Sequence, residues 1–323
     1  MSVVVTGAAG FIGYHVAEAL LARGDRVIGV DNLNDYYDVG LKRARLERLQ
    51  AKPGFAFRKL DLADREAMLA LGGELSDTTE IVHLGAQPGV RYSLVNPYAY
   101  VTSNVMGQVT VLELARGLKK LRNLVYASSS SVYGGNTKLP FAVGDPVETP
   151  QSLYAATKRA DELIAHTYAH LYGLPLVGLR FFTVYGPWGR PDMAPILFAR
   201  AMLAGEPIRV FNNGEMWRDF TYVDDIAAGV VAAMARPPAD TPPHRLYNLG
   251  NHQSEKLTDF IAALEGALGV KAAVRFEPMQ PGDVVSTYAD IAEAQRDLGF
   301  QPATPMAAGV AKFVAWYRTY YRA

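Results

Sequence analysis

Near its start the chain reads Val3-Val4-Val5-Thr6-Gly7-Ala8-Ala9-Gly10-Phe11-Ile12-Gly13, an apolar β-branched run followed by three spaced glycines. Residues 3–6 have the composition of a buried strand, and the residues after Gly13 have the apolar spacing of a helix. Glycine at these three positions permits a tight turn, close approach of the backbone to a pyrophosphate, and close packing of the helix on the strand. The free N–H groups of the helix start attract phosphate. The stretch therefore predicts a strand–turn–helix unit that binds a dinucleotide.

The second predicted strand supports the same site. Val27-Ile28-Gly29-Val30 ends in Asp31, whose carboxylate would accept hydrogen bonds from the adenosine ribose and repel a 2′-phosphate, which favours NAD over NADP. Asp61, after the third strand, is either an adenine contact or a helix N-cap. The predicted contacts of the cofactor outside the catalytic helix are Gly7, Gly10, Phe11, Ile12, Gly13, Asp31, Asn32, Asp61, Leu62, Leu84 and Ala86.

Beyond this unit, short apolar runs alternate with amphipathic segments up to about residue 182. The runs are 3–6, 27–30, 55–60, 81–84, 124–127 and 176–182, and the amphipathic segments are 14–22, 41–49, 101–118 and 154–171. Such alternation predicts an α/β chain with a Rossmann-like, doubly wound parallel sheet and a smaller C-terminal α/β substrate domain. We expect an NAD-binding domain at 1–183, with 223–250 returning to it, and a substrate-binding domain at 184–222 and 251–323.

Composition narrows the class of partner. The 323 residues include 32 Lys+Arg, 32 Asp+Glu and no Cys, so the formal net charge is zero. Without a general positive field, neither nucleic acid nor an anionic membrane surface is an expected partner. No thiol chemistry is possible, and redox work requires a borrowed cofactor. No apolar run reaches the roughly 18 residues of a membrane helix, and the first strand begins almost at Met1, so we expect a cytoplasmic protein.

A second group of residues, Tyr154, Lys158 and the serines at 128–131, is the predicted catalytic site. Tyr154 and Lys158 are spaced i, i+4, which puts both side chains on one face of a helix. A phenol that moves protons near neutral pH needs a neighbouring ammonium to stabilise its phenolate, and Lys158 can supply it. The preceding strand ends in a run of serines, 128–131, where the Ser129 hydroxyl can orient a substrate oxygen while the nicotinamide accepts hydride. A capped turn is the purely structural alternative for the serine run.

Together these motifs resemble the extended short-chain dehydrogenase/reductase family over essentially the whole chain. The segments 31–37, 89–93, 128–134, 186–193 and 218–222 resemble the UDP-glucuronate 4-epimerases in particular. The resemblance implies that Ser129, Tyr154 and Lys158 are catalytic, that NAD stays tightly bound, and that Phe181, Val184 and Asn104 lie near the cofactor. It also implies a homodimer formed through 101–118 and 154–171.

Relatives that oxidise C4 of a nucleotide sugar diverge afterwards. The 4,6-dehydratases carry acidic residues where this chain has Ser129-Ser130-Ser131, so elimination is disfavoured and 4-epimerisation of UDP-glucuronate and UDP-galacturonate through a 4-keto intermediate is favoured. We expect Arg190 to bind the substrate carboxylate, although a surface salt bridge is an alternative for it. Arg218 resembles a residue that clamps the UDP diphosphate. The other predicted substrate contacts are Arg91, Ser93, Ser129, Ser130, Thr183, Gln280, which stands where relatives often have arginine, and Asp283.

Two alternatives remain open from the sequence. The same residues could serve a UDP-glucose/UDP-galactose 4-epimerase, which would not depend on Arg190. The chain could also be a non-catalytic NAD-sensing protein, although such proteins commonly lose the tyrosine or the lysine, and both are present here. Pro88 stands where the resemblance predicts alanine, and the sequence assigns it no role.

Overall fold

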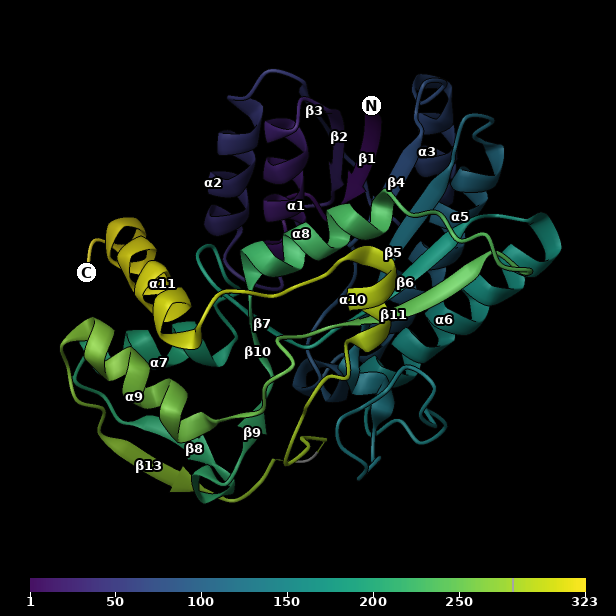
Figure 1. Ribbon diagram of the computed structural model, residues 1–323. Helices are drawn as coiled ribbons and strands as arrows, with labels where there is room; N and C mark the ends of the chain where they lie inside the picture. The colour runs from purple at the N-terminus through teal and green to yellow at the C-terminus, as the bar shows by residue number, and fades with distance from the viewer. Residues whose placement is uncertain (281) are drawn as a thin grey trace.

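The computed structural model describes residues 1–280 and 282–323, and its largest element is a seven-stranded parallel sheet (Figure 1). β1 is fully buried along its length, as expected where helices cover both faces of a parallel sheet. The Rossmann-like α/β class is thereby confirmed. In spatial order the strands are β11 (His244–Leu249), β6 (Leu176–Phe181), β5 (Asn123–Ser129), β4 (Glu80–His83), β1 (Ser2–Thr6), β2 (Arg26–Asp31) and β3 (Phe55–Lys59).

Helices cover the two faces of this sheet. One layer contains α1 (Phe11–Ala22), α2 (Val39–Gln50) and α8 (Val223–Met234), and α8 packs along α1 (Figure 1). The other layer contains α3 (Arg65–Ala70), α5 (Gly107–Gly117) and α6 (Leu153–Tyr172). Because the crossovers change face between β1 and β4, a crevice opens at the carboxyl ends of these two strands. Gly7 follows one strand and Leu84 the other, so the predicted phosphate loop lies at this crevice.

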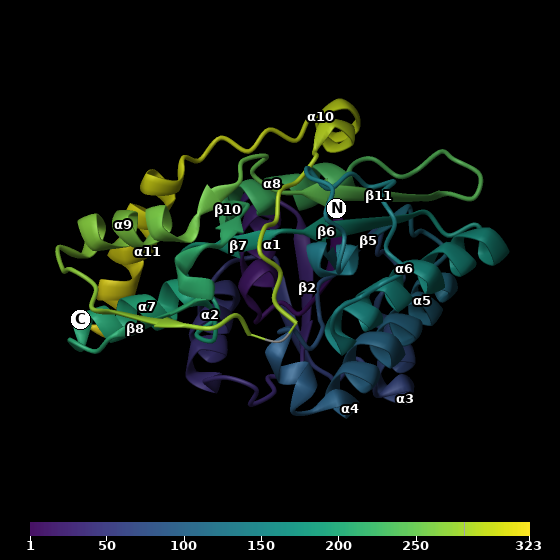
Figure 2. The ribbon, with the colours of Figure 1, turned by 90° about the horizontal axis from the view of Figure 1, so that it is seen from below.

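A smaller part of the chain lies beyond the carboxyl ends of the strands (Figures 1 and 2). It is built from three strand pairs and from helices that pack on them; α9 packs against α11 and α7. The pairs are β7 (Thr183–Tyr185) with β10 (Phe220–Tyr222), β8 (Ile208–Phe211) with β13 (Val274–Glu277), and β9 (Trp217–Arg218) with β12 (Glu255–Lys256); the helices are α7 (Ala194–Leu203), α9 (Leu257–Leu268) and α11 (Met306–Tyr321). The remaining helix of this region, α10 (Ala292–Leu298), contacts β11 and α8 of the larger part.

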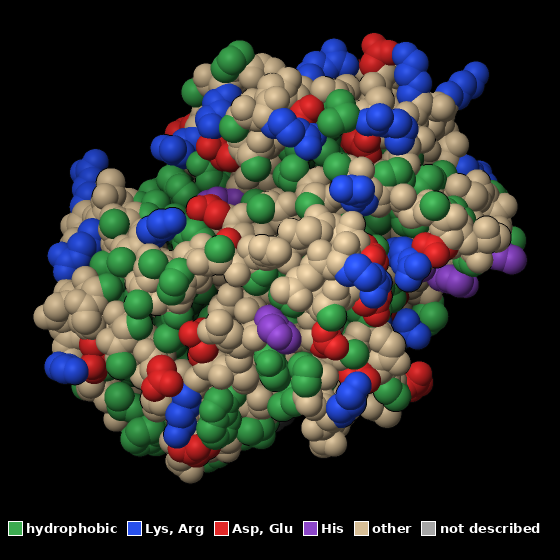
Figure 3. Space-filling model, in the orientation of Figure 1, with side chains coloured by type: hydrophobic (Ala, Val, Ile, Leu, Met, Phe, Trp, Pro, Cys, Tyr) green, Lys and Arg blue, Asp and Glu red, His purple; other side chains and the backbone are tan. Residues whose placement is uncertain are grey.

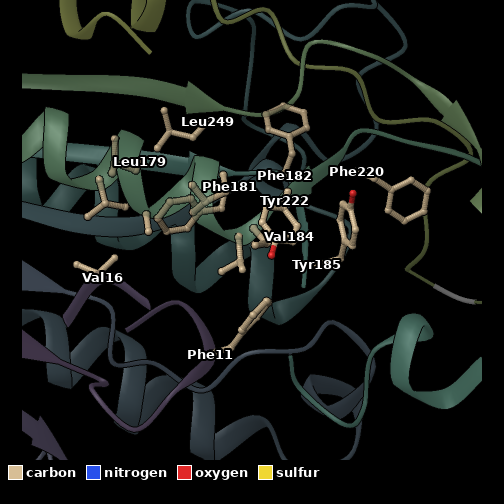
Figure 4. Close-up of a cluster of buried hydrophobic side chains, with 14 of the residues drawn as sticks. Phe11, Val16, Leu179, Phe181, Phe182, Val184, Tyr185, Phe220, Tyr222 and Leu249 are labelled. Atoms are coloured by element: carbon tan, nitrogen blue, oxygen red, sulfur yellow. The ribbon is translucent and has the colours of Figure 1, made fainter. Parts of the chain in front are cut away.

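One apolar cluster joins the two parts. It contains Phe181, the last residue of β6, and Val184 of the short strand that follows. Phe11 of the phosphate loop and Phe220 and Tyr222 of β10 belong to the same cluster (Figure 4). These side chains are at most 8% exposed. Burying each of these side chains stabilises the folded state by about 1.5–3 kcal/mol. The cluster therefore fixes the two parts against each other below the crevice.

One predicted helix differs from the structure. Residues 101–118 do not form a single regular helix, because α4 (Pro97–Tyr100) leads into a π-helical turn, η3 (Val101–Met106), before α5 begins. Pro97 at the first turn and the Asn96 side chain, which accepts from the Ala99 N–H, start the helix earlier than predicted. The wider turn rotates Asn104 toward the loop after β4.

The surface matches the balanced composition. On the face shown in Figure 3, Lys and Arg side chains are interspersed with Asp and Glu. Within residues 1–280 and 282–323, none of the helices combines the length and the apolar character that crossing a bilayer requires.

Candidate functional site

The predicted phosphate loop is as tight as its glycines suggest. A Cβ on Gly13 would lie 2.0 Å from the Gly7 carbonyl oxygen, and one on Gly7 would lie 2.8 Å from the Gly85 backbone nitrogen. Gly10 occupies the N-cap of α1 and supplies no side chain to cap it. The loop therefore leaves the first N–H groups of α1 available to a ligand in the pocket that Gly10 and Gly13 line.

Asp31 ends β2 beside this loop and lines the same pocket. Its Oδ2 accepts from the Ala9 N–H at 3.1 Å and its Oδ1 from the Leu33 N–H at 2.9 Å. Burial raises the pKa of this carboxyl, although the Leu33 N–H and the Lys42 charge act in the opposite direction. Asn32, the next residue, donates to Asp61 at 2.8 Å. The carboxylate is thus held in place at one end of the pocket, with a free face toward it.

Lys42 is a lining residue that the sequence reading missed. Its ammonium donates to the Asn34 carbonyl at 2.7 Å, and the side chain is only 5% exposed. Burial lowers the pKa of Lys42, while Asp31 raises it. The pair places a cation and an anion at the same end of the pocket.

Tyr154, Lys158 and Ser129 line the same pocket as the phosphate loop. Tyr154 lies at the start of α6, where Ser152 Oγ caps the helix by accepting from the Ala155 N–H at 3.1 Å. Lys158 Nζ donates to the Ala127 carbonyl at 3.0 Å, which fixes the ammonium against the end of β5. The residues that the sequence spacing grouped together, Tyr154, Lys158 and Ser129, therefore line one cavity.

A buried ionic network lies beneath these groups. Glu162 of α6 accepts from Arg180 Nε at 2.8 Å, from Arg180 Nη2 at 2.9 Å and from Ser128 Oγ at 2.6 Å. Burial raises the pKa of Glu162, but the bonds from Arg180 and Ser128 outweigh it and hold the pKa below its usual value. Arg159 completes the set at 3.1 Å. The network joins the ends of β5 and β6 to α6 and so fixes the platform that carries Tyr154.

Arg190 also lines the pocket, but it has a partner of its own. Its Nε donates to Asp192 Oδ1 at 3.0 Å and its Nη2 to Asp192 Oδ2 at 2.6 Å, and Tyr36 OH donates to the same carboxylate at 2.9 Å. Burial raises the pKa of Asp192, but Arg190 and Tyr36 outweigh it and hold the pKa below its usual value. The guanidinium is thus present at the wall of the pocket with an internal counter-ion.

A second pocket adjoins the first, because Ser129 lines one and Ser130 the other. Thr183, Arg218 and Asp283 also line it. Arg218 donates to the Val285 carbonyl at 3.1 Å, and burial lowers its pKa while Asp283 raises it. Asp283 forms an ion pair with Arg91 at 2.9 Å. Asp283 is thus the counter-ion of Arg91, while Arg218 forms no ion pair with a described residue and leaves positive charge for an anionic ligand.

Four predicted contacts fall outside both pockets as the described residues define them: Asn104, Arg91, Ser93 and Gln280. Asn104 is buried and bonds the Gln87 backbone N–H at 2.7 Å, so it supports the loop after β4. Ser93 is 2% exposed and donates to the Val90 carbonyl at 2.6 Å. The Gln280 carbonyl accepts from the Asp283 N–H at 3.2 Å, which places this residue beside the second pocket.

Every other predicted contact lines one of the two pockets. The first pocket contains Gly7, Gly10, Phe11, Ile12, Gly13, Asp31, Asn32, Asp61, Leu62, Leu84, Ala86, Ser129, Tyr154, Lys158, Phe181, Val184 and Arg190. It also contains residues that the sequence reading did not assign, among them Asn34, Tyr36, Tyr37, Lys42, Gly85, Pro88, Ser103 and Met193. Tyr36 and Tyr37 lie inside segment 31–37, which resembles the UDP-glucuronate 4-epimerases, so that resemblance could have marked them as pocket residues. Pro88 accepts from Tyr100 OH at 2.8 Å through its carbonyl.

Arg45 of α2 links the phosphate loop to the segment that carries Arg190. The side chain is fully buried, and its Nη1 donates to the Ala9 carbonyl at 2.9 Å. Its Nη2 donates to the carbonyls of Trp188 at 2.6 Å and Gly189 at 3.1 Å. One guanidinium thus satisfies backbone groups from both sides of the crevice.

Comparison with known proteins places this geometry in a family. The family model described as "NAD dependent epimerase/dehydratase family" matches residues 3–250. UDP-glucuronate 4-epimerase 4 of Arabidopsis thaliana is 48% identical, covering 99% of this chain and 76% of the relative, and protein CapI of Staphylococcus aureus is 45% identical over 100% of both. The crystal structure of UDP-glucuronic acid 4-epimerase from Bacillus cereus in complex with UDP-glucuronic acid and NAD superimposes with a TM-score of 0.92 at 33% identity, covering 99% of this chain and 100% of that chain. With the match extending from the phosphate loop through β11, this chain belongs to the NAD-dependent epimerase/dehydratase family.

Proposed function

We propose that the chain is a 4-epimerase that interconverts UDP-glucuronate and UDP-galacturonate. The observation that carries the proposal is the convergence, in one pocket, of the phosphate loop, Tyr154 with Lys158, and Arg190. These groups supply a dinucleotide site, a proton-transfer pair and a cation for a carboxylate. The similarity to UDP-glucuronate 4-epimerases over nearly the whole chain supports the same substrate.

The residues present fit NAD. A Cβ at Gly10 or Gly13 would collide with the backbone, so the loop keeps the bare cradle that a pyrophosphate needs. Asp31 offers a carboxylate to the ribose hydroxyls at the far end of the pocket. The chemistry that NAD would supply there is reversible hydride acceptance from C4 of the sugar. We expect NAD to remain bound through purification, since both transfers need the same molecule.

Tyr154 is the proposed base and acid. Its phenol would take the proton of the sugar 4-hydroxyl, and Lys158 would stabilise the charge that this requires. Ser129 Oγ would orient the same sugar oxygen; in the structure it accepts from the Ser131 N–H at 3.2 Å. After the 4-keto sugar has turned over in the site, the same phenol would return the proton. Epimerisation requires no further acid.

Glu162, Asp31 and Asp61 are unsuited to elimination. Glu162 has both oxygens engaged by Arg180, Arg159 and Ser128, and its pKa stays low because these bonds outweigh its burial. Asp31 and Asp61 lie at the end of the pocket proposed for the adenosine. Dehydration needs acid and base groups positioned at C5 and C6, so epimerisation is the better fit.

Arg190 would hold the uronate carboxylate. The 4-keto intermediate is a β-keto acid, which tends to lose CO₂, so the group must be held where that loss is slow. A guanidinium gives two parallel hydrogen bonds to a carboxylate plane. Arg218 and Thr183, which line the adjoining pocket, would bind the UDP portion.

A second candidate is a 4-epimerase of UDP-glucose and UDP-galactose. The ion pair between Arg190 and Asp192 favours it, since this cation is already balanced and need not attract a second carboxylate. The reaction chemistry would be unchanged, because Tyr154, Lys158 and Ser129 do not contact C6 in either scheme.

We also propose which part of the chain binds each ligand and how two chains associate. Residues 1–183 and 223–250 would bind NAD, and 184–222 with 251–323 would bind the UDP-sugar. A homodimer would form through residues 101–118 and 154–171. These segments expose large apolar side chains, including Val101 at 51% and Leu171 at 60%.

The test is a product assay by NMR on purified protein with UDP-glucuronate, UDP-glucose and UDP-N-acetylglucosamine in parallel. UDP-galacturonate should accumulate to an equilibrium mixture, and Tyr154→Phe should abolish it. Turnover of UDP-glucose alone would establish the second candidate. If wild-type protein with bound NAD converts none of the three sugars, the epimerase proposal is wrong.

A further inference from the structure

The ammonium of Lys158 has a buried partner that the mechanism above does not use. Asp161, three residues further along α6, accepts from Lys158 Nζ through Oδ2 at 3.0 Å, and the two side chains are 5% and 1% exposed. The Ala127 carbonyl accepts a second hydrogen bond from the same ammonium at 3.0 Å. Since an ammonium has three donors, one remains for the pocket. Asp161 and Ala127 thus decide where that third donor points.

The second oxygen of Asp161 is unsatisfied. Oδ1 is buried, and no residue that the structure describes donates to it. Burial raises the pKa of Asp161 to about 6, although Lys158 lowers it. A buried ion pair with incomplete hydrogen bonding is seldom a net source of stability. Stabilisation of the fold therefore does not explain the Lys158–Asp161 ion pair.

A matching donor lies on the neighbouring helix. η3 and α5 both pack against α6, and Asn104 Nδ2 of η3 donates to Thr157 Oγ1 of α6 at 3.0 Å. Gln108 of α5 and Asp161 of α6 each lie four residues further along the chain from this bonded pair. Gln108 is 1% exposed, and its Nε2 also lacks an acceptor within the described part of the chain. A side-chain rotation or one bridging water would join this donor to Oδ1.

The remaining ionisable groups around the pair keep one charge state. Glu162 is ionised, because Arg180 of β6 and Arg159 hold its pKa low against its burial. Burial raises the pKa of Tyr126 of β5 far above its usual value, so it stays neutral. Burial, with a smaller effect of Lys158, lowers the pKa of His83 of β4 to about 3, so it too stays neutral. Asp161 is consequently the neighbour whose charge modulates Lys158.

We propose that Asp161 is a positioning residue for the reaction: it aims the Lys158 ammonium and partly balances its charge, and thereby sets the pH at which Tyr154 can exchange a proton. This rests on the proposed roles of Tyr154 and Lys158. The carboxylate acts through Lys158 and touches no reacting atom. Gln108 supports it by offering a donor to the oxygen that Lys158 leaves unpaired.

The informative variant is Asp161→Asn, which keeps an acceptor for Lys158 Nζ and removes the negative charge. The uncompensated ammonium then stabilises the phenolate more strongly and is itself held less firmly. Both limbs of the pH–rate profile should move to lower pH by about one unit. Asp161→Ala removes the acceptor as well and should also lower kcat more than about tenfold. Asp77→Asn, an exposed carboxylate paired with Lys120, is the matched control and should shift nothing.

A spectroscopic titration separates this proposal from the proposed function. The phenolate absorbance of Tyr154, taken as the difference from Tyr154→Phe, is followed against pH with Asp or Asn at position 161, without any sugar. A downward shift with Asn supports the proposal even if no UDP-sugar is converted; an unchanged or raised midpoint in folded protein overturns it. If Asp161→Asn does not fold, Gln108→Leu takes its place. It disfavours the charged carboxylate and should shift the midpoint the same way, and an unshifted midpoint there overturns the proposal equally.

Discussion

Arg190 and Asp192 form a two-bond ion pair at the wall of the pocket, with Nε–Oδ1 at 3.0 Å and Nη2–Oδ2 at 2.6 Å. The pair is part of the site, because Arg190 lines the same cavity as Tyr154. A uronate that binds Arg190 must therefore share the guanidinium with Asp192 or displace it. This competition makes the two residues the most direct probe of substrate choice.

Arg190→Ala should reduce turnover of UDP-glucuronate by about a hundredfold or more, since a charge-assisted bidentate contact contributes on the order of 3 kcal/mol. Activity on UDP-glucose, if the wild type has any, should change far less. Asp192→Asn serves as the companion variant, because it frees the guanidinium and should lower KM for the uronate. Equal losses on charged and neutral sugars would contradict a carboxylate-binding role. Steady-state kinetics on both sugars measures this.

Gly13→Ala should empty the cofactor site. The added Cβ would lie 2.0 Å from the Gly7 carbonyl, so the loop must distort, at a cost of about 1–3 kcal/mol. Nicotinamide released by acid from the purified variant should fall well below the wild-type amount. Gly266→Ala is the control: its Cβ meets nothing within 4 Å on α9, and it should stabilise the fold by about 0.5–1 kcal/mol. A variant at Gly13 that retains NAD fully would show that the loop does not bind the pyrophosphate.

His244 should make stability pH-dependent. Burial, with the His166 charge, lowers its pKa to about 4, so between pH 4 and 6.5 the unfolded chain binds the proton and the folded chain does not. Stability from this group is therefore lost as pH falls through that window, at up to about 1.4 kcal/mol per pH unit. Burial raises the pKa of Asp219 to about 6 and that of Glu255 to about 7, and these groups act with the opposite sign.

The measurement accordingly compares urea unfolding of His244→Gln with wild type from pH 7 to pH 4.5. The variant should gain stability relative to wild type as pH falls. His170→Gln, on the exposed surface of α6, should follow wild type at every pH. A difference that is constant over the range would show that His244 does not titrate as described.

Leu163→Glu should dissociate the proposed dimer. Leu163 is 53% exposed on α6, in the segment 154–171 that also exposes Leu171, and a carboxylate there would be desolvated by a second copy. Light scattering at micromolar concentration should report the mass of one chain for the variant and of two for wild type. Val274→Glu, at an exposed position on β13, should leave the mass unchanged.

The sequence predicted those parts of the molecule whose signal is local. The glycine turn, Asp31 after β2 and the spacing of Tyr154 and Lys158 each lie within one strand–helix unit, and the structure brings them to one pocket. Lys42 was missed because its side chain reaches the pocket from the first turn of α2, whose sequence has no motif of its own. Asp161 was missed for a similar reason, since an acidic residue in an amphipathic helix is ordinarily a solvated one.

Other departures have a tertiary cause. Hydrophobic periodicity does not reveal the π-helical turn η3, in which Asn104 accepts from the Gln87 backbone N–H; a place for Asn104 near the cofactor stays a prediction. The ion pair of Arg190 with Asp192 is the alternative that the sequence left open for this arginine, and the backbone before it passes through Trp188, which has a φ of +61°. Backbone conformations of this kind are set by the packing of several segments rather than by the residue itself.

The buried guanidinium of Arg45 means that assembly of the two ligand sites is not independent. Its donors are divided between Ala9 in the phosphate loop and Trp188 and Gly189, which precede Arg190. Any disorder in one segment would leave part of that guanidinium without acceptors inside the protein, at a cost of several kcal/mol. The glycine-rich loop and the segment that leads to Arg190 therefore become ordered together, and a molecule that has lost one has weakened the other.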